Sequence, residues 1–534
     1  MLNATEKAIK ELLTLSIQTR EELLAQKRVI AKKHGLKILA NSEILKFLSR
    51  PEISEDLPLQ KILRKRAIRT LSGIAPVAVL TKPFACPGKC AYCPTEKDVP
   101  QSYLSNEPAV MRAIRCGYDP YKQVQLRLKA LEANGHEPTK IELIVIGGTW
   151  SVLPIEYKYW YIVNCFKAAN DYRKTRKAQG VTQKAISKKL SIKKLKTVLL
   201  EEQKKNEKAK YNIIGLTLET RPDYIDEKEL LEMRELGATR VELGVQAIDD
   251  AILKLNKRGH GVDKIIEATK WLRDFGFKIT YHLMPGLPGA TAAKDLKMFK
   301  QLFTDENFQP DQIKFYPTVV TRGSLLYKWW KAGKYKPYSD KVLQKLIIDC
   351  KKFIPHYVRI IRLIRDIPGE SIVAGNIITN LRQVMQQKGV ECNCIRCREV
   401  KEKSITNYQL RITNYKANGG KEYFIEVCSM DEKVLYGFCR LRLPSSHNAQ
   451  RITHNALNDA ALIRELHVYG VLVAVGKDKK IQHAGFGKML MAEAEKIAKE
   501  NDFEKMAVIS GVGVRGYYKK LGYKLKDTYM VKKL

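Results

Sequence analysis

The sequence predicts two α/β units in tandem, a partial TIM-like (β/α)6 barrel followed by a smaller α+β domain. From about residue 76, short apolar runs alternate with amphipathic segments, as in the repeated strand–helix units of a parallel sheet. After residue 405 the strand-like segments follow one another directly, which is typical of an antiparallel sheet. The length of 534 residues supports a division into two or three domains, because a single core rarely serves so long a chain.

Six apolar runs are the expected barrel strands, and polar or glycine residues follow each of them. The runs are residues 77–80, 141–146, 213–218, 240–245, 279–284 and 312–316. The carboxyl ends of parallel strands form the ligand-binding edge of α/β folds, so these following residues are expected to line a site. They include a cysteine cluster after the first run, Gly147, Gly148 and Thr149 after the second, and Gln246 after the fourth.

Changes in composition divide the chain into four expected parts. Residues 1–75 are basic helices, 76–385 the barrel, 386–404 a Cys-rich linker and 405–534 the α+β domain. A Lys-rich stretch at 173–210 has no consistent apolar spacing and is interpreted as a surface insertion of the barrel. The last domain is expected to hold strands at 408–415, 423–429 and 434–443, and a strand at 471–475 before a glycine loop.

The net charge of +38 favours a polyanionic partner. Nucleic acid is the leading candidate, an anionic membrane surface is a weaker one, and a merely solubilising surface is the third interpretation. Residues 1–20 do not resemble a secretory signal, and no run of about 18 apolar residues predicts a membrane span. We therefore expect a cytoplasmic protein with no membrane association.

Eleven cysteines in such a chain indicate metal or redox chemistry in preference to a disulfide framework. Five of them are isolated and are interpreted as small buried hydrophobes: Cys116, Cys165, Cys350, Cys428 and Cys439. The other six fall in two tight clusters.

The first cluster reads Cys86-Pro-Gly-Lys-Cys90-Ala-Tyr-Cys93. The CxxxCxxC spacing allows three thiolates to bind three irons of a [4Fe-4S] cluster, which leaves the fourth iron open for S-adenosylmethionine (SAM). The alternative is a zinc site, which usually pairs CxxC with a second ligand pair nearby, and none lies close in sequence. Gly147, Gly148 and Thr149 end the next strand, where open backbone groups are expected to pair with the amino group of SAM.

The second cluster is Cys392-Asn-Cys394-Ile-Arg-Cys397. Three thiolates this close suggest a structural zinc with a fourth ligand from elsewhere, and such an ion would fasten the two domains. Unligated thiols and a second iron–sulfur cluster are the alternatives.

A glycine loop in the last domain reads Gln482-His-Ala-Gly485-Phe486-Gly487-Lys488 and leads into a helix expected at 486–500. Glycines at a helix N-terminus expose backbone N–H groups that suit the pyrophosphate of coenzyme A. The QxxGxG pattern, with a strand before it and a strand–helix unit after it, is that of GNAT acetyltransferases. Tyr517 and Tyr518 lie on the last helix, where a tyrosine can protonate a departing thiolate. The competing interpretation of two adjacent tyrosines is one core and one surface residue.

Long stretches of the chain match a single family. They include Gly215-Leu-Thr-Leu-Glu-Thr-Arg-Pro-Asp223, Tyr281-His-Leu-Met-Pro-Gly-Leu-Pro-Gly289 and residues 69–74, 107–113, 240–246, 365–368, 394–399, 465–470 and 510–523. On these motifs the chain resembles the catalytic subunit of Elongator, in its stand-alone bacterial or archaeal form. It differs from the eukaryotic members in its short CxxxCxxC loop and in having Pro94-Thr95-Glu96 where they have a glycine pair.

The resemblance implies a substrate, the wobble uridine of certain tRNAs, and a product, 5-carboxymethyluridine. It implies that a 5′-deoxyadenosyl radical takes a hydrogen from the methyl group of acetyl-CoA, that the carbon radical adds to carbon 5 of uridine, and that hydrolysis frees CoA. An electron donor for the cluster is then required, and a homodimer is compatible with the resemblance. The alternatives are a protein lysine acetyltransferase with a structural cluster and a non-catalytic RNA-binding scaffold.

The resemblance also implies roles for individual residues. Lys140 matches a lysine that contacts acetyl-CoA, and Tyr518 matches the C-terminal tyrosine of the family. The remaining matches are a β-strand contact with acetyl-CoA, formed by Glu465, Leu466, His467 and Val468, and a pyrophosphate loop, formed by Phe486, Gly487 and Lys488.

Overall fold

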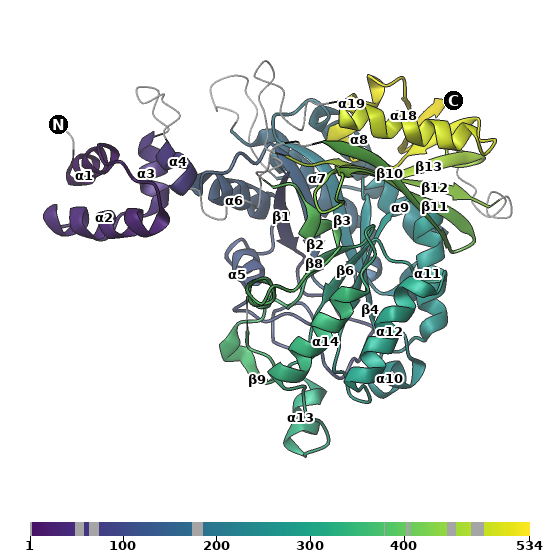
Figure 1. The fold of residues 1–534 in the computed structure, drawn as a ribbon, viewed down its shortest axis with the longest axis horizontal. Coiled ribbons are helices and arrows are strands. Elements are labelled where there is room, and N and C mark those ends of the chain that lie inside the picture. The colour runs from purple at the N-terminus through teal and green to yellow at the C-terminus, as the bar shows by residue number, and fades with distance from the viewer. Residues whose placement is uncertain are drawn as a thin grey trace.

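The computed structural model describes residues 3–48, 58–63, 74–173, 185–378, 380–401, 405, 407–445, 455–470 and 485–534. Within them the chain forms two seven-stranded sheets and an N-terminal group of helices (Figure 1). The first sheet is called the barrel sheet below, and the second the C-terminal sheet.

The barrel sheet has the strand order β1-β2-β3-β4-β5-β6-β8, and every neighbouring pair is parallel. Its strands are β1 Ile74–Leu80, β2 Lys140–Ile146, β3 Asn212–Thr220, β4 Arg240–Gln246, β5 Lys278–Leu283, β6 Gln312–Phe315 and β8 Arg359–Arg362. The six expected strands and the α/β fold class are confirmed. The barrel sheet has one strand more than expected, because the sequence Arg-Ile-Ile-Arg of β8 is too short and too charged to stand out.

Helices cover the outer face of the barrel sheet (Figure 1). They are α5 Pro108–Arg115, α6 Pro120–Ala133, α7 Ile155–Asp171, α8 Ile192–Asn206, α9 Glu227–Glu235, α10 Asp250–Leu255, α11 Val262–Asp274, α12 Ala292–Thr304 and α14 Asp340–Lys352, whereas α13 Leu325–Lys331 lies below the sheet, beside β7. On β2 the outward-facing Ile141, Leu143 and Val145 are buried. The residues that alternate with them are partly exposed, namely Lys140, Glu142, Ile144 and Ile146. Side chains alternate between the two faces of a strand, so the inner face of the sheet is open to solvent along β2.

The expectation of a surface insertion at 173–210 is wrong for its second half. Helix α8 packs against α7, and its Leu195 and Leu199 are buried in the main core. Asn206 at its end donates to Asn170 Oδ1 over 2.7 Å and accepts from the backbone N–H of Ile213. Helix α8 therefore belongs, with α7, to the crossover between β2 and β3, which its many lysines conceal in the sequence. Residues 174–184 lie outside the described part of the chain.

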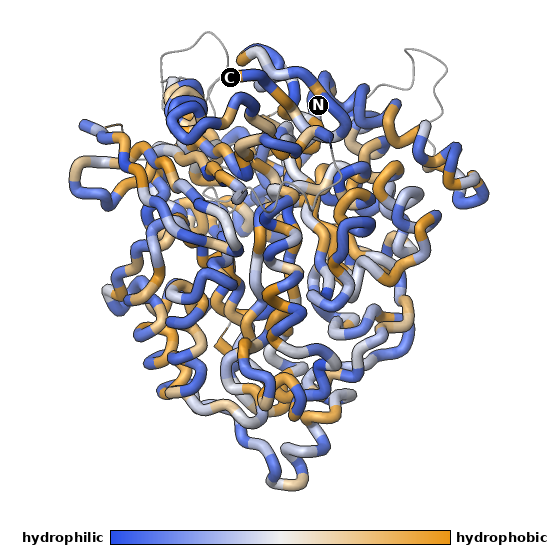
Figure 2. The backbone as a smooth tube through the Cα atoms, turned by 90° about the vertical axis from the view of Figure 1, so that its right-hand side faces the viewer, coloured by the Kyte–Doolittle hydropathy of each residue, from blue (hydrophilic) through white to orange (hydrophobic). Residues whose placement is uncertain are grey.

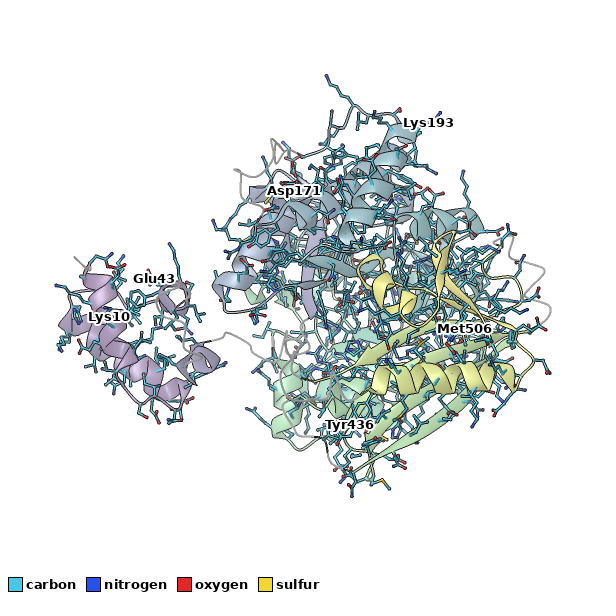
Figure 3. The ribbon with its side chains drawn as sticks, turned by 90° about the horizontal axis from the view of Figure 1, so that it is seen from above. Lys10, Glu43, Asp171, Lys193, Tyr436 and Met506 are labelled. Carbon is cyan, nitrogen blue, oxygen red and sulfur yellow. The ribbon has the colours of Figure 1, made fainter. Side chains whose placement is uncertain are left out.

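The N-terminal helices α1 Ala4–Leu13, α2 Arg20–Lys33, α3 Asn41–Leu48 and α4 Pro58–Leu63 form a small core of their own. Asn3 and Thr19 cap α1 and α2, each in a capping box with a glutamate three residues later. Figure 3 shows these helices, with Lys10 and Glu43 labelled, standing to one side of the body of the molecule. The expectation of basic helices here is confirmed for the described residues.

The C-terminal sheet has the order β10-β11-β12-β13-β14-β16-β15, and only its β13–β14 pair is parallel. The strands are β10 Tyr408–Ala417, β11 Gly420–Ser429, β12 Leu435–Pro444, β13 Ala460–Val468, β14 Lys505–Val508, β15 Lys524–Lys526 and β16 Tyr529–Lys533. Helices α18 Phe486–Lys499 and α19 Arg515–Lys519 accompany it. The strands expected at 408–415, 423–429 and 434–443 are confirmed, and the strand expected at 471–475 lies outside the described residues.

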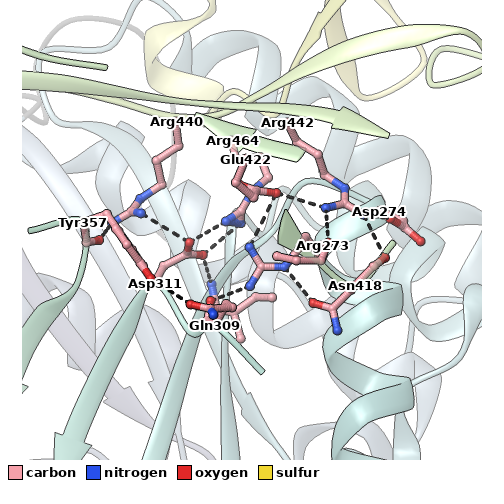
Figure 4. Close-up of polar contacts among 12 residues, drawn as sticks. Arg273, Asp274, Gln309, Asp311, Tyr357, Asn418, Glu422, Arg440, Arg442 and Arg464 are labelled. Carbon is pink, nitrogen blue, oxygen red and sulfur yellow. Dashed lines mark hydrogen bonds and ion pairs between the residues drawn. The ribbon is translucent and has the colours of Figure 1, made fainter. Parts of the chain in front are cut away.

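The C-terminal sheet packs against the amino ends of the barrel strands. Gly511 approaches so closely that a Cβ there would stand 1.9 Å from the carbonyl oxygen of Ile214, at the start of β3. Arginines of β12 and β13 reach Asp311, just before β6, and Asp274, at the end of α11 (Figure 4). The cysteine loop after β1 lies at the opposite, carboxyl end.

Three smaller features complete the description. A two-stranded sheet pairs β7 Val320–Thr321 with β9 Ile372–Ala374, and helices α15 Leu381–Gln387 and α16 Ile395–Arg398 lead to the C-terminal sheet. Apolar and polar segments alternate through the body of the molecule (Figure 2). Among the described helices, none combines the length and the apolar character that a bilayer crossing needs.

Candidate active site

The first cysteine cluster lies at the carboxyl ends of β1 and β2. Cys86 Sγ is 3.9 Å from Thr149 Oγ1, and the backbone N–H of Cys93 donates to the carbonyl of Cys90 over 3.2 Å. The thiols of Cys90 and Cys93 hydrogen-bond each other. Three cysteines on one loop can each bind a separate iron of a cubane cluster.

Two arginines that the sequence did not single out surround Cys90. Arg258, 5% exposed, places Nη1 3.3 Å from Cys90 Sγ, and Arg221 Nη1 lies 4.0 Å from the same sulfur. A hydrogen bond from Cys93 and the guanidinium of Arg258 lower the pKa of the Cys90 thiol to about 4, although burial opposes the shift. A Cβ at Gly88 would stand 2.3 Å from Arg221 Nη1, so a larger residue there would displace this guanidinium from Cys90. The positive charges suit an anionic cluster.

Gly147, Gly148 and Thr149 lie beside the cysteine loop as expected. The two glycines have φ of +132° and +103°, a region that side chains rarely adopt, and a Cβ at Gly147 would stand 2.2 Å from Thr81 Oγ1. Gln246 at the end of β4 has φ +69°, and its buried Oε1 has no hydrogen-bond partner among the described residues. A strained residue with an unused polar atom at this rim fits a polar ligand such as SAM.

Charged side chains line the inner face of the barrel sheet between its two ends. Glu142 of β2 pairs with Arg240 of β4 over 2.6 Å, near the amino end. Deeper in, Glu242 binds both Lys314 and His282, with 2.8 Å between its Oε2 and His282 Nε2. Burial would raise the pKa of Glu242, but these positive neighbours outweigh it and hold the pKa well below its usual range.

The row of polar groups continues to the carboxyl end. Nδ1 of His282 lies 3.6 Å from Glu219, the residue before the last of β3, and Tyr103 donates to the same carboxylate over 2.9 Å. Arg365 lies over the ring of Tyr103. Hydrophobic pattern alone could not find this row, because its members sit singly within otherwise apolar strands.

Among the residues that the structure describes, part of the β13 backbone is paired on one side only. Residues Ala460 to Ile463 pair with β14, whereas the following residues Glu465, Leu466, His467 and Val468 pair there with β12 alone. Parallel strands that separate in this way open a slot with free backbone groups. The Glu465 side chain is 7% exposed and bound by Lys278 and Arg440, so the partial exposure of this residue belongs to its backbone.

His467 lies beside aromatic rings in this slot, with the charged groups of Glu465 and Lys278 nearby. Its ring lies 4.2 Å from the ring of Tyr469, its Nε2 is buried without a partner among the described residues, and burial lowers its pKa to about 4. The imidazole is therefore neutral at physiological pH. A neutral ring with one unused nitrogen is suited to a hydrogen bond with a ligand.

The start of α18 lies beside this slot. Gly485 is the N-cap in the left-handed region with φ +81°, and no side chain caps the helix. Phe486 is buried against Tyr408 and Tyr436, while Gly487 and Lys488 continue the first turn. The free N–H groups of this turn suit a pyrophosphate. Gln482, which belongs to the same sequence motif, lies outside the described residues.

The two adjacent tyrosines of α19 point to different surroundings. Tyr517 is 36% exposed, and a Cβ at Gly487 would stand 2.7 Å from its hydroxyl, so this side chain faces the start of α18. Tyr518 is 6% exposed and packs edge-on against Tyr523, and burial raises its pKa above the usual range. Tyr518 thus keeps its proton.

Lys140 is the first residue of β2 and lies far from the cysteine cluster. Its neighbour across the sheet is Asn212, whose side chain donates to the carbonyl of Gly513 over 3.3 Å. Burial lowers the pKa of Lys140. The structure therefore groups Lys140 with the C-terminal sheet, at the opposite end of β2 from Gly147, Gly148 and Thr149.

The second cysteine cluster is compact. The Sγ atoms of Cys392, Cys394 and Cys397 all lie within 4.8 Å of one another, and no fourth His, Cys, Asp or Glu joins them among the described residues. A Zn–S bond of about 2.3 Å places two ligand sulfurs about 3.8 Å apart, which fits this spacing. Hydrogen bonds from Cys392 and Cys397 lower the pKa of Cys394.

The compact cluster ties two parts of the chain together. The backbone N–H of Ile395 donates to the carbonyl of Val358 just before β8, and Glu399 bridges to Leu435 at the start of β12. A zinc ion at these sulfurs would therefore hold the barrel sheet and the C-terminal sheet in register.

Comparison with known families agrees with this arrangement. Residues 82–302 match the Radical SAM superfamily, residues 310–389 match the Radical_SAM C-terminal domain, and residues 396–523 match the Acetyltransferase (GNAT) family. The fold and the cysteine loop define a radical SAM enzyme with a GNAT acetyltransferase domain.

Relatives along the whole chain identify the family more closely. The chain is 44% identical to a tRNA uridine(34) acetyltransferase of Methanocaldococcus infernus over 93% of its own length and 91% of that protein. It is 37% identical to human Elongator complex protein 3 over 98% of its own length and 96% of that protein. The structure of the archaeal Methanocaldococcus infernus Elp3 with an N-terminal deletion superposes with a TM-score of 0.71 at 39% identity, covering 86% of this chain and 99% of that chain. The chain belongs to the tRNA uridine(34) acetyltransferase family, to which Elongator complex protein 3 is related, and the resemblance seen in the sequence is confirmed.

Proposed function

We propose that this protein attaches the acetyl carbons of acetyl-CoA to carbon 5 of the wobble uridine of tRNA, giving 5-carboxymethyluridine. The observation that carries the proposal is the position of β2. Its amino end, Lys140, lies at the C-terminal sheet, and its carboxyl end leads to Thr149, beside Cys86. The inner face between them spans about 20 Å at 3.3 Å per residue and is partly open.

The residues at the carboxyl end fit a [4Fe-4S] cluster with Cys86, Cys90 and Cys93 as its ligands. When bound, such a cluster supplies the electron that cleaves SAM into methionine and a 5′-deoxyadenosyl radical. Gly147, Gly148 and Thr149 then hold the amino group of SAM through open backbone groups. Arg258 and Arg221 would balance the negative charge of the thiolates, and reduction at this site would need an external electron donor.

The residues at the amino end fit acetyl-CoA. The free backbone of β13 from Glu465 to Val468 hydrogen-bonds the pantetheine arm, and the first turn of α18 at Gly485, Phe486, Gly487 and Lys488 holds the pyrophosphate, with Gln482 in the same loop. Lys140 lies at the mouth of the barrel, where its ammonium group contacts the acetyl thioester. The proton of Tyr518 is available to the thiolate of the departing CoA.

The remaining parts bind the substrate and hold the domains together. The basic helices in residues 1–75 and the net charge of +38 attract tRNA, and we expect the protein to act where tRNA is found, in the cytoplasm. A zinc ion on Cys392, Cys394 and Cys397 stabilises the junction at 386–404 between the barrel in 76–385 and the domain in 405–534.

The test is anaerobic reconstitution with iron and sulfide, followed by reaction with SAM, acetyl-CoA, a reductant and tRNA, and mass spectrometry of the nucleosides. We expect 5-carboxymethyluridine with the wild type and with Cys350→Ala, a buried cysteine outside the clusters, and none with Cys90→Ala. Acetylation of a lysine-containing protein by Cys90→Ala at the wild-type rate, with no modified uridine from the wild type, would establish a protein acetyltransferase instead.

A further inference from the structure

A basic and aromatic projection stands at the carboxyl rim of the barrel. Residues 322–338, here called the spur, contain α13 and read Arg-Gly-Ser-Leu-Leu-Tyr-Lys-Trp-Trp-Lys-Ala-Gly-Lys-Tyr-Lys-Pro-Tyr. The segment has five basic residues and no acidic one. Figure 1 shows α13 as the lowest point of the molecule, and the same tip in Figure 2 is mostly hydrophilic.

The base of the spur is fixed to the cysteine loop. The backbone N–H of Leu326 donates to the carbonyl of Ala91, between Cys90 and Cys93, over 2.7 Å. The N–H of Thr95 donates to the carbonyl of Gly323, and Gly323 has φ +79° with no room for a Cβ, which would stand 2.7 Å from Thr95 O. The position of the spur relative to the cluster is therefore set by backbone contacts.

The C-terminal half of the spur is fixed to the loop after β5 and to the first turn of α12. Tyr335 donates to the carbonyl of Gly286, and Tyr338 donates to Asp295, each over 2.7 Å. The projection is held at both ends and presents its tip to solvent.

The tip combines unpaired positive charge with aromatic rings. Lys328, Lys331, Lys334 and Lys336 are exposed, and in the described part of the chain none of them forms an ion pair with a carboxylate. Tyr327 and Trp330 stack with their ring centroids 6.0 Å apart, and Trp329 beside them is half-buried. The rings of Tyr327, Trp329 and Trp330 pack in part against the main core, and Lys331 lies over the Tyr327 ring at 5.6 Å. Packing does not account for the exposed charges of Lys328, Lys334 and Lys336.

We propose that the spur is an RNA-binding element that holds the anticodon loop of tRNA next to the cluster. Its lysines contact phosphates, and the indole face of Trp329 or Trp330 stacks on an unpaired base. Lysines interleaved with aromatic rings recognise single-stranded nucleic acid because phosphates and base faces recur along the strand. The identity of the RNA as tRNA rests on the proposed function, whereas the surface itself follows from the structure.

The first test removes the charge. The variant Lys328→Ala, Lys331→Ala, Lys334→Ala, Lys336→Ala is compared, as reconstituted protein in about 0.15 M salt, with the wild type for binding of fluorescently labelled tRNA. The control removes four exposed lysines of the C-terminal domain, Lys499, Lys520, Lys524 and Lys526. We expect the dissociation constant to rise about tenfold or more in the spur variant and less than about threefold in the control, with a shallower salt dependence for the spur variant. Equal weakening in both, or none in the spur variant, overturns the proposal.

The second test addresses stacking. Trp329→Ala, Trp330→Ala should weaken tRNA binding about tenfold, while Trp329→Phe, Trp330→Phe keeps it within about threefold, since a phenyl ring still stacks. Reductive SAM cleavage without tRNA, unchanged in both, shows that the cluster site is intact. Equal affinity of the Ala and Phe variants for tRNA would contradict the stacking of a base on these rings.

A reductase is the alternative partner for a surface this close to the cysteine loop, and the same variants decide between the two partners. Slower cluster reduction by a flavodoxin with unchanged tRNA binding assigns the spur to the electron donor and overturns the proposal. A wild-type protein that binds tRNA through the spur but forms no 5-carboxymethyluridine contradicts the proposed function and leaves the RNA-binding surface standing.

Discussion

Arg464 of β13 and Asp311, just before β6, form a buried bidentate ion pair between the two sheets. Nη1 of Arg464 lies 2.9 Å from Asp311 Oδ2, Nη2 donates to Oδ1, and both side chains are 0% exposed. The same guanidinium reaches Glu422 over 3.1 Å, and Arg440 also faces Asp311 (Figure 4). This network fixes the distance between the two candidate sites, because moving either sheet would strand buried charges.

Breaking the pair should destabilise the protein strongly. Arg464→Met leaves Asp311 buried with fewer partners, and we expect a loss on the order of 3–5 kcal/mol in the free energy of unfolding, measured by urea denaturation. Lys345→Met is the control, since Lys345 is 78% exposed in its pair with Asp349 and should cost less than about 1 kcal/mol. Similar losses in the two variants would show that the buried pair contributes no more to the free energy of unfolding than the exposed pair does.

Acid should loosen the same interface. Burial would raise the pKa of Glu422, but Arg464, Arg273 and Arg442 outweigh it and hold the pKa at about 2. An unfolded glutamate has a pKa near 4.3, so the folded state gains stability that is present above about pH 5 and lost as the pH falls toward 2. The stability difference between wild type and Glu422→Gln should therefore shrink by about 2 kcal/mol between pH 6 and pH 2.5. A difference that is independent of pH would contradict the low pKa.

The compact cysteine cluster should bind zinc independently of iron. Cys394→Ser should lower the zinc content, measured by plasma mass spectrometry, from about one ion per chain to near zero, because one thiolate of three is lost. Iron bound after reconstitution should be unchanged, and Cys439→Ser, at an isolated buried cysteine, should retain both metals. Zinc retained in Cys394→Ser, or iron lost from it, would rule out this assignment.

The two tyrosines of α19 should differ in their kinetic effects. Tyr518→Phe removes the buried hydroxyl, whose raised pKa keeps it protonated, and should lower turnover of acetyl-CoA about 100-fold with little change in KM. Tyr517→Phe, at the exposed side chain beside Gly487, should raise KM for acetyl-CoA a few-fold and leave kcat near the wild-type value. The reverse pattern would assign the catalytic role to Tyr517.

The sequence predicted the parts of this protein that follow local rules. Apolar runs located six strands of the barrel sheet, and the glycine loop located the start of α18 at Phe486, because each depends on spacing within a few residues. The cysteine spacing also predicted the close grouping of Cys392, Cys394 and Cys397. Strand β8 was missed, and helix α8 was interpreted as part of a surface insertion. In both, charged residues interrupt the short apolar pattern whose side chains are buried.

The charged interior could not be predicted, because it depends on residues far apart in the chain. Arg442 and Glu422 carry no motif, and charged strand residues usually face solvent, yet both are almost fully buried against α11. Arg258 lies in a loop without a motif, and only the folded chain brings it to Cys90. The separation of Lys140 from Thr149 along β2 likewise emerges only from the packing of the second sheet on the first.

The most direct test of the account is whether the two domains act in one reaction. Reconstituted protein is incubated with SAM, reductant, tRNA and acetyl-CoA that carries three deuteriums on its methyl group, and the 5′-deoxyadenosine is analysed by mass spectrometry. The account predicts that deuterium from the acetyl group appears in 5′-deoxyadenosine and that the remaining labelled carbon appears in the wobble uridine. Unlabelled 5′-deoxyadenosine formed together with a modified uridine would contradict it.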